Sequence, residues 1–406
     1  MDAPPSTLRA DLRWLPRPVW FLLAGSFVNR FGSFVLPFLV LYLTHRGYTA
    51  AQSGLAISAY GIGSIAAAAV GGHLADRVGR RQTIAASMLS SAVVMIALSQ
   101  AGDLGLILGL AALAGLTSES YRPASSALLA DLVPAGRRVT AFAAYRFAIN
   151  IGFAAGPAVA GLLAQHAFVL VFIGDAVTSA VFGVMALVLL PATHPAPTPA
   201  PVEARGATRT ILSDVPFLLF LAATTIGAIV YFQQEAALPL QVLADGHSLA
   251  IYGSLISVNG LVVTAIELPF SSITRKFPPR HVIALGSILL GCGFGATALV
   301  VSTPALAATV VLWTFGEIVS APVSSAYLAD ISPPHMRGRY AGAFSMTYGI
   351  GLIVGPAAGT AVFAASPGLL WGGCLALGGV SAVLMLIPTA RPPGYATTAS
   401  RSTSAA

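Results

Sequence analysis

Charged side chains are scarce in this chain of 406 residues. They make up 9% of it, whereas hydrophobic residues make up 56% and the mean hydropathy is +0.83. A soluble globular domain carries about 25% charged residues, and so little charge cannot cover the surface of a soluble fold. The composition therefore excludes an ordinary soluble enzyme, an intrinsically disordered chain and a secreted disulfide scaffold.

Residues that mark particular chemistries are also few. Lys276 is the only lysine, and the two cysteines, Cys292 and Cys374, lie in apolar runs without a CxxC or histidine pattern nearby. The seven histidines form no HExxH motif, and no phosphate-binding GxxxxGK[ST] loop is present. We therefore expect no metal, no cofactor and no use of ATP, and the sequence offers no catalytic constellation of an enzyme.

Long apolar runs, by contrast, recur along the whole chain. A bilayer core about 30 Å thick needs roughly 20 apolar residues per helix, and helices satisfy their own backbone groups in lipid. The sequence therefore predicts an all-α membrane protein with twelve spans, at about 19–44, 50–74, 82–102, 104–133, 139–164, 167–191, 214–241, 250–274, 281–302, 304–332, 338–365 and 367–388.

The basic residues predict the orientation of these spans, because loops rich in Lys and Arg stay in the cytoplasm. With both termini inside, the cytoplasmic segments hold 17 of the 21 basic residues, and the outer loops hold only Arg46. The same split explains the net charge of +7 without nucleic acid, since these residues meet anionic lipid. We expect a multi-pass protein of a bacterial-type inner membrane.

A change of composition divides the chain after the sixth span. The stretch 191–209 carries five prolines among Ala and Thr, which indicates an extended, partly stiff linker. We therefore expect an N-terminal six-helix bundle at 1–190, a cytoplasmic linker at 191–213, a C-terminal six-helix bundle at 214–390 and a flexible cytoplasmic tail at 391–406.

The two halves repeat each other. An offset of 199 residues aligns Pro123 with Pro322, Asp131 with Asp330 and Gly156-Pro157 with Gly355-Pro356, without a gap. Parallel repeats of six-helix halves are the plan of many secondary transporters, whose substrate sites lie near the midplane where the halves meet. The repeat therefore predicts a monomer of two pseudo-symmetric bundles around a central cavity.

Two motifs resemble those of the major facilitator superfamily. The loop after the second span reads GHLADRVGRR (72–81), which is similar to the signature loop of that family. The fifth span carries GFAAGPAVAG (152–161), which resembles the glycine-proline signature of its drug:proton antiporters. The fourth span departs from the antiporter pattern, because Ala111 stands where that pattern has an arginine four residues before Gly115.

The resemblance implies a gate on the cytoplasmic side and helix-packing positions in the fifth and eleventh spans. Acidic residues at the ends of the second and fourth spans are expected to pair with the arginines of the signature loop. The gate residues are Gly72, Asp76, Arg77, Gly79, Arg80, Arg81 and Asp131. The packing hinge comprises Gly152, Gly156 and Pro157 with their counterparts Gly351, Gly355 and Pro356.

Charged residues inside the spans are the strongest functional candidates, because each costs on the order of 2.5–3.5 kcal/mol at a helix centre and must find a partner or water. Helical spacing places Glu119 and Arg122 on one face, and Glu317, Ser320 and Ser324 on another. We expect a midplane cavity that binds substrate or couples protons, with Arg30, Arg122, Arg146 and Asn150 on one side and Glu235 and Glu317 on the other.

Other interpretations of these charges stay open. Glu119 is alternatively a structural partner of Arg122 or Arg30, and Asp175 in the sixth span is as readily structural as functional. Glu267 is a candidate partner of Arg275 or Arg280 near the cytoplasmic end. We expect Glu317 to carry a transported proton, because no arginine shares its helix face, and Glu119 with Arg122 to sense the substrate.

Two transport functions fit this pattern. The first is proton-coupled export of amphiphilic organic compounds or drugs by alternating access, through a largely apolar cavity. The alternative is proton-coupled uptake of a small anionic or zwitterionic solute such as a peptide, which the arginines within the spans favour. Asn29-Arg30-Phe31 has a faint likeness to a peptide-transporter signature, although Ser26 and Asn29 replace its glutamates. The expected partners are a small molecule, protons and lipid.

Overall fold

The structure is a computed structural model that describes residues 14–134, 137–192, 211–333 and 336–388. Twelve of its helical stretches are long and apolar enough to cross a membrane. They match the twelve spans predicted from the apolar runs to within a few residues for most of their ends, because a run of about 20 apolar residues fixes both the type and the length of such a helix. The all-α fold with two halves is confirmed.

The first half contains six spans, of which two are built from two helices each. They are α2 (Arg17–Phe31) with α3 (Val35–His45), α4 (Ala50–Arg77), α5 (Arg80–Gln100), α6 (Leu104–Glu119) with α7 (Tyr121–Leu132), α8 (Arg138–His166) and α9 (Phe168–Leu189).

The second half also contains six spans, and its first is broken twice. They are α11 (Val215–Tyr231) with α12 (Gln233–Ala236) and α13 (Leu238–Ala244), α14 (Leu249–Thr274), α15 (Pro279–Ala296) with the 3-10 turn η2 (Thr297–Leu299), α16 (Thr303–Ile331), α17 (Arg337–Ala365) and α18 (Pro367–Leu386). The predicted linker falls mostly, and the predicted tail wholly, outside the described residues.

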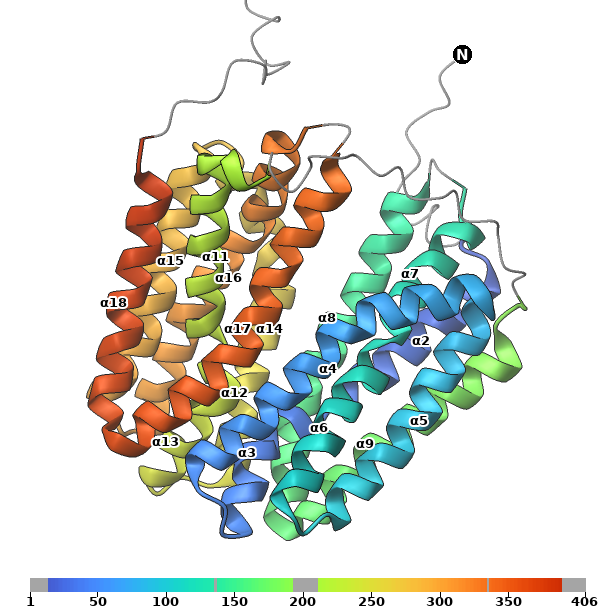
Figure 1. Cartoon of the computed structure of the whole chain (residues 1–406), viewed down its shortest axis with the longest axis horizontal. Coiled ribbons are helices and arrows are strands. Elements are labelled where there is room, and N and C mark those ends of the chain that lie inside the picture. Colours follow the sequence, from blue (N-terminus) through green and yellow to red (C-terminus); the bar gives the residue numbers. More distant parts are fainter. Residues whose placement is uncertain (1–13, 135–136, 193–210, 334–335, 389–406) are drawn as a thin grey trace, which may run out of the picture.

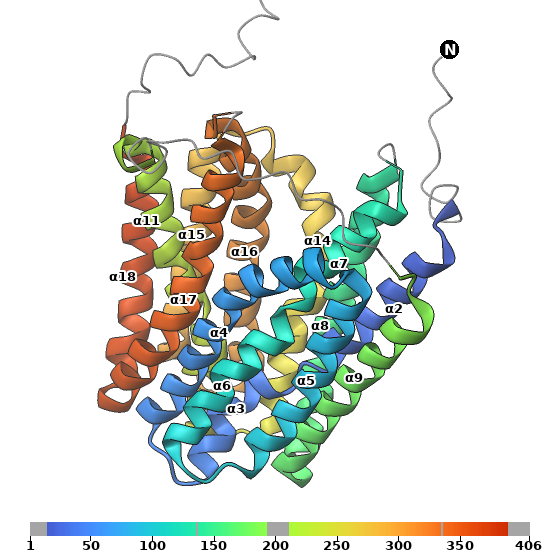
Figure 2. The ribbon, with the colours of Figure 1, turned by 45° about the vertical axis from the view of Figure 1, so that its right-hand side comes forward.

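The two halves pack in the same way, as their repeat requires. In the first half α8 lies against α2, and in the second half the corresponding α17 lies against α11. Across the halves α8 packs along α14, and α17 packs along α4 (Figure 1; Figure 2). The close approach of α8 and α14 needs glycine, because a Cβ on Gly260 would lie 2.6 Å from the Cα of Ala154.

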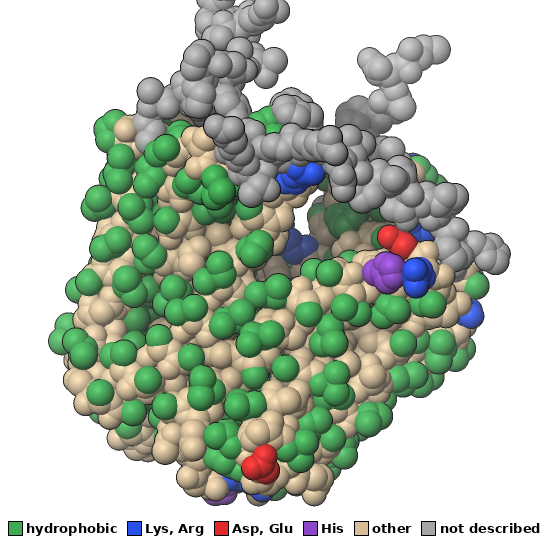
Figure 3. Space-filling model, viewed as in Figure 1, with side chains coloured by type: hydrophobic (Ala, Val, Ile, Leu, Met, Phe, Trp, Pro, Cys, Tyr) green, Lys and Arg blue, Asp and Glu red, His purple; other side chains and the backbone are tan. Residues whose placement is uncertain are grey.

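The hydrophobic core joins the two halves at one end only. We call the end where α2 begins and α18 ends the proximal end, and the opposite end the distal end (Figure 1). At the distal end one core cluster joins both halves, with Phe38 of α3 against Tyr252 of α14 at 5.2 Å between ring centroids. At the proximal end each half has its own core cluster. The molecule is therefore closed distally, and Figure 3 shows a hollow between the halves near the proximal end.

Candidate functional site

A cavity of about 240 Å³ lies between the two halves. Its lining comes from α2, α7 and α8 of the first half and from α11, α14 and α16 of the second. The residues are Arg30, Arg122, Ile149, Asn150, Phe153, Tyr231, Asn259, Gly260, Val263 and Glu317. We call it the central cavity. Its walls combine aromatic and aliphatic side chains with three charged groups, which suits an amphiphilic occupant.

The first half contributes a charged cluster around Glu119. One carboxylate oxygen of Glu119 lies 2.9 Å from Nη1 of Arg122, and the other lies 3.7 Å from Nη2 of Arg30. The Tyr60 hydroxyl donates to the carboxylate of Glu119 at 3.5 Å. The predicted pairing of Glu119 with Arg122 is present, and Arg30 joins it, so the pair is a triad that bears a net positive charge beside the cavity.

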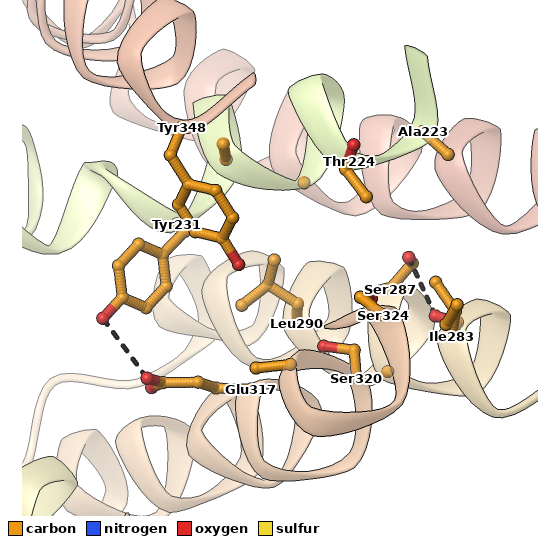
Figure 4. Close-up of a pocket in the computed structure, with 14 residues that line it drawn as sticks. Ala223, Thr224, Tyr231, Ile283, Ser287, Leu290, Glu317, Ser320, Ser324 and Tyr348 are labelled. Atoms are coloured by element: carbon orange, nitrogen blue, oxygen red, sulfur yellow. Dashed lines mark hydrogen bonds between the residues drawn. The ribbon is translucent and has the colours of Figure 1, made fainter. Parts of the chain in front are cut away.

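The second half contributes Glu317, which contacts neutral donors. Asn259 donates to one carboxylate oxygen at 3.1 Å, and the Tyr231 hydroxyl donates to the other at 3.5 Å (Figure 4). No arginine forms an ion pair with Glu317 in the described part of the chain. The cavity therefore has an arginine-rich wall in one half and a carboxyl group with neutral partners in the other.

Helix breaks lie beside these groups. Arg30 stands in the last turn of α2, where the helix macrodipole favours a cation. Glu119 ends α6 and Tyr231 ends α11, so one break lies in the charged cluster and the other beside the partner of Glu317. Discontinuous helices of this kind are typical of midplane binding sites in transporters.

Arg146 and Glu235 do not line the central cavity, in contrast to the expectation from sequence. Arg146 pairs with Glu267 across the halves. The expectation that Glu267 pairs with Arg275 or Arg280 was therefore also wrong. Arg146 and Glu267 line a wider space of about 360 Å³, which we call the vestibule. It adjoins the central cavity at Asn150 and Val263.

Glu235 is in a different environment from Glu317. It is 8% exposed in the short helix α12, which packs against α3 in the distal contact. Its neighbouring cavity of about 50 Å³ is also lined by Arg30, Glu119 and Asp175. Spacing along one span cannot reveal this, because the helix is interrupted after Tyr231 and the face of Glu235 changes.

Asp175 serves the backbone of the broken first span. Its carboxylate accepts a hydrogen bond from the backbone N–H of Val35 at 3.2 Å, at the first residue of α3. The first N–H groups of a helix lack partners within the helix, and a carboxylate there is favourable. This contact supports the structural interpretation of Asp175.

The expected gate residues lie at the proximal end. Arg80 pairs with Asp131 at 2.5 Å, within the first half. Asp76 and Arg77 end α4 and are exposed, and the described residues give Asp76 no ion pair. Gly79 has a φ of 96°, which favours glycine at the turn between α4 and α5. Gly72 and Arg81 lie on either side of this turn and are half-buried.

The expected packing glycines form equivalent contacts in both halves. A Cβ on Gly152 would lie 2.8 Å from the backbone oxygen of Phe27, and Gly156 faces Phe31, both on α2. In the second half Gly351 faces Ala228, and a Cβ on Gly355 would lie 2.9 Å from the oxygen of Ile229, both on α11. Pro157 and Pro356 lie inside α8 and α17. These contacts establish close packing, and a hinge role for the six residues stays a prediction.

Asn259 and Tyr60 were missed from the sequence. Asn259 is 2% exposed and bonds both Thr314, at 3.0 Å, and Glu317. A single amide within an apolar span was the available signal, because a buried amide needs partners. Tyr60 carried no comparable signal, since a tyrosine in an apolar span is also an ordinary core residue.

The family model described as Major Facilitator Superfamily matches residues 22–244 and 234–405, one match over each half. The chain is 27% identical to an uncharacterized MFS-type transporter, YqjV, of Bacillus subtilis (strain 168), over 83% of this chain and 84% of the relative. It is 25% identical to a Na(+), Li(+), K(+)/H(+) antiporter of Planococcus maritimus, over 82% and 87%.

A further relative is the multi-drug resistance efflux pump PmrA homolog of Lactococcus lactis subsp. lactis (strain IL1403), at 25% identity over 83% of this chain and 85% of the relative. Among solved structures, the peptide transporter POT in complex with sulfate has a TM-score of 0.73 at 18% identity. The match covers 94% of this chain and 98% of that chain, and shows the same fold. On the family match over both halves, with twelve apolar helices, the chain is a multi-pass membrane protein that belongs to the Major Facilitator Superfamily of transporters.

Proposed function

We propose that this protein exports amphiphilic organic compounds in exchange for protons, by alternating access. The observation that carries the proposal is the composition of the central cavity. Apolar walls at Ile149, Phe153 and Val263 suit an amphiphile, and Glu317, bonded by neutral donors, can exchange a proton without breaking an ion pair. The resemblance to an efflux pump and to a proton antiporter supports the same direction.

Uptake of a small anionic or zwitterionic solute together with protons is the second candidate. Arg30, Arg122 and Asn150 face the central cavity and would bind a carboxylate. This arrangement is the specific observation that favours it. The two candidates differ in the sign of coupling, since an exporter moves its substrate against the proton flow and a symporter moves it along the proton flow.

Transport by the full chain in proteoliposomes with an imposed pH gradient distinguishes the two. The probes are a cationic dye, a zwitterionic drug and a dipeptide. We expect the dye to move against the proton gradient and the dipeptide to stay where it is. Movement of the dipeptide along the proton gradient would favour the uptake function over the export function. The absence of proton-coupled movement for all three probes would contradict both functions.

The membrane placement and the division of the chain are part of the proposal. The basic residues of the proximal loops support a cytoplasmic proximal end, in a bacterial-type inner membrane. The first bundle is proposed to end at residue 190, after α9, and the second to begin at 214, before α11, with a linker between them and a tail from 391. A monomer suffices, because both walls of the cavity come from one chain.

A further inference from the structure

A second polar cavity lies inside the C-terminal half and meets the central cavity at Glu317. It measures about 120 Å³ and is enclosed by α11, α15 and α16, with Tyr348 of α17 at its edge (Figure 4). Its lining includes four serine and threonine hydroxyl groups, from Thr224, Ser287, Ser320 and Ser324. We call it the serine pocket. Glu317 and Tyr231 line both cavities, so the carboxyl group stands between them.

The hydroxyl groups of the pocket are placed to accept hydrogen bonds from water. Ser320 donates to the oxygen of Gly316 at 2.7 Å, and Thr224 donates to the oxygen of Phe220 at 2.9 Å, each on its own helix. Their oxygen lone pairs remain for another donor. Ser324 is 4% exposed and lines the pocket.

The pocket leads from Glu317 toward the proximal end. Ser320 and Ser324 follow Glu317 on the same face of α16, and seven residues of helix span roughly 10 Å. One water molecule needs roughly 10–15 Å³ of such space, so the pocket has room for several. The other titratable side chains that line it are Tyr231 and Tyr348.

A second route matters because an occupant of the central cavity would cover Glu317 from that side. In an exporter the substrate enters from the proximal end while the proton must leave toward the same end. A single passage would place substrate and proton in each other's way. A pocket on the opposite side of the carboxyl group removes this conflict.

We propose that the serine pocket holds a chain of water molecules that carries the proton of Glu317 toward the proximal end. The inference rests on the proposed function, in which Glu317 carries the transported proton. The proton passes from the Glu317 carboxyl group to the nearest water and along the hydroxyl-bound waters to bulk solvent. The carboxylate that remains keeps its hydrogen bonds from Asn259 and Tyr231.

The test measures proton release after a pH jump in the purified full chain, with a pH-indicator dye in stopped flow. The part of the signal that Glu317→Gln removes belongs to Glu317. To stand in for the substrate, Val263→Cys is modified with fluorescein maleimide, which fills the central cavity, in a background with Cys292→Ala and Cys374→Ala. We expect release from Glu317 to continue in this blocked protein.

Ser324→Leu then fills the pocket. In the blocked protein it should slow release from Glu317 by roughly tenfold or more, equivalent to about 1.4 kcal/mol in activation free energy. The matched control is Ser325→Leu, an exposed neighbour on α16 that does not line the pocket, and release should stay at the rate of the blocked parent. If Ser324→Leu does not fold, Thr224→Val with Ser324→Ala removes two hydroxyls at nearly constant volume and should also slow release.

Two results would overturn the inference while leaving the proposed function intact. One is that blocking the central cavity alone stops release from Glu317. The other is that the blocked protein with Ser324→Leu, or with the double substitution, releases its proton at the parent rate. If Glu317→Gln removes no proton signal at all, the proposed function itself fails and this inference fails with it.

Discussion

At the scale of single residues, the environments of two carboxyl groups separate their roles. Glu119 has two guanidinium groups within 3.7 Å, whereas Glu317 has an amide and a phenol as partners. The Glu119 carboxylate therefore forms ion pairs with both arginines. A carboxyl group with neutral partners accepts or loses a proton without breaking an ion pair, so the two groups suit different steps of one cycle.

We therefore predict that Glu317→Gln removes proton coupling and keeps substrate binding. Transport driven by a pH gradient should fall by roughly tenfold or more, about 1.4 kcal/mol in activation free energy, while exchange of substrate without a gradient continues. Glu119→Gln should instead weaken substrate binding, because it frees Arg30 and Arg122 from their shared partner. Retention of gradient-driven transport by Glu317→Gln, with its loss in Glu119→Gln, would exchange the two roles.

A second prediction concerns the ion pair between Arg146 and Glu267. The Arg146 side chain is 63% exposed and the Glu267 side chain 12% exposed. Arg146→Gln leaves a mostly buried carboxylate without its partner, whereas Glu267→Gln leaves an arginine that water already reaches. Arg146→Gln should thus lower thermal stability in detergent more than Glu267→Gln does, with a coupling energy of about 1 kcal/mol in a double-mutant cycle. Equal effects of the two substitutions would contradict the argument from burial, and additive effects in the cycle would show that the pair contributes nothing.

The ion pairs of Glu119 with Arg122 and of Arg146 with Glu267 differ in how far the sequence predicts them. Glu119 and Arg122 are three residues apart on one helix, so local geometry fixes their contact. Arg146 and Glu267 are 121 residues apart, on different halves. Helical spacing gives the direction of a side chain on its own helix and says nothing of which helix lies opposite. For this reason Arg146 was placed in the central cavity and its partner was missed.

At the scale of helices, the ends of the spans were predictable and their interruptions were not. Apolar length sets where a span begins and ends, which a sequence displays directly. The spans are interrupted after Phe31, Glu119 and Tyr231. The first break has a tertiary partner, because the carboxylate of Asp175 accepts a hydrogen bond from the backbone N–H of Val35. Nothing local marks Ser120 or Phe232 as the point of interruption.

The break in the seventh span takes part in the distal contact, which leads to a third prediction. The Tyr252 hydroxyl of α14 lies 3.1 Å from the oxygen of Pro37 in α3 and 2.9 Å from the oxygen of Gln234 in α12. Tyr252→Phe removes both contacts, but only the one to Pro37 joins the two halves. One hydrogen bond is worth about 1 kcal/mol, so the distally open population should rise roughly fivefold. Distances between spin labels at positions 100 and 243 would report the change.

Tyr48→Phe is the matched control, because the Tyr48 hydroxyl bonds the oxygen of Gly102 at 2.7 Å within the first half. It removes a tyrosine hydroxyl bond at the same end without touching the other half. The label distances of this variant should equal those of the parent. A shift in Tyr48→Phe as large as that in Tyr252→Phe would contradict the assignment of the distal contact to Tyr252.

At the scale of the whole molecule, the core clusters fit one end state of the alternating-access cycle that we propose. The halves share a core distally and have separate cores proximally, so the cavity opens toward the proximal end. In that proposed cycle the reverse state closes the proximal end, and we expect the groups that hold it closed to lack those partners in the present state. Asp76 fits this condition, because it is exposed at the end of α4 and forms no ion pair among the described residues.

The last prediction follows from that asymmetry. Asp76→Asn costs the present state nothing, because no described residue pairs with Asp76 in it, but it removes a contact that we expect only when the proximal end closes. An exposed ion pair is worth about 0.2–1 kcal/mol, so the proximally open population should rise by up to roughly fivefold and transport should slow by a similar factor. Membrane insertion should be unchanged, because topology follows the basic residues.

Asp131→Asn is the contrasting variant, since Asp131 already pairs with Arg80 within the first half, and its loss weakens that half in both states. Wild-type transport by Asp76→Asn at equal expression, or an unchanged distribution of label distances across the proximal end, would remove Asp76 from the gate and leave the basic residues of the loop as determinants of topology alone.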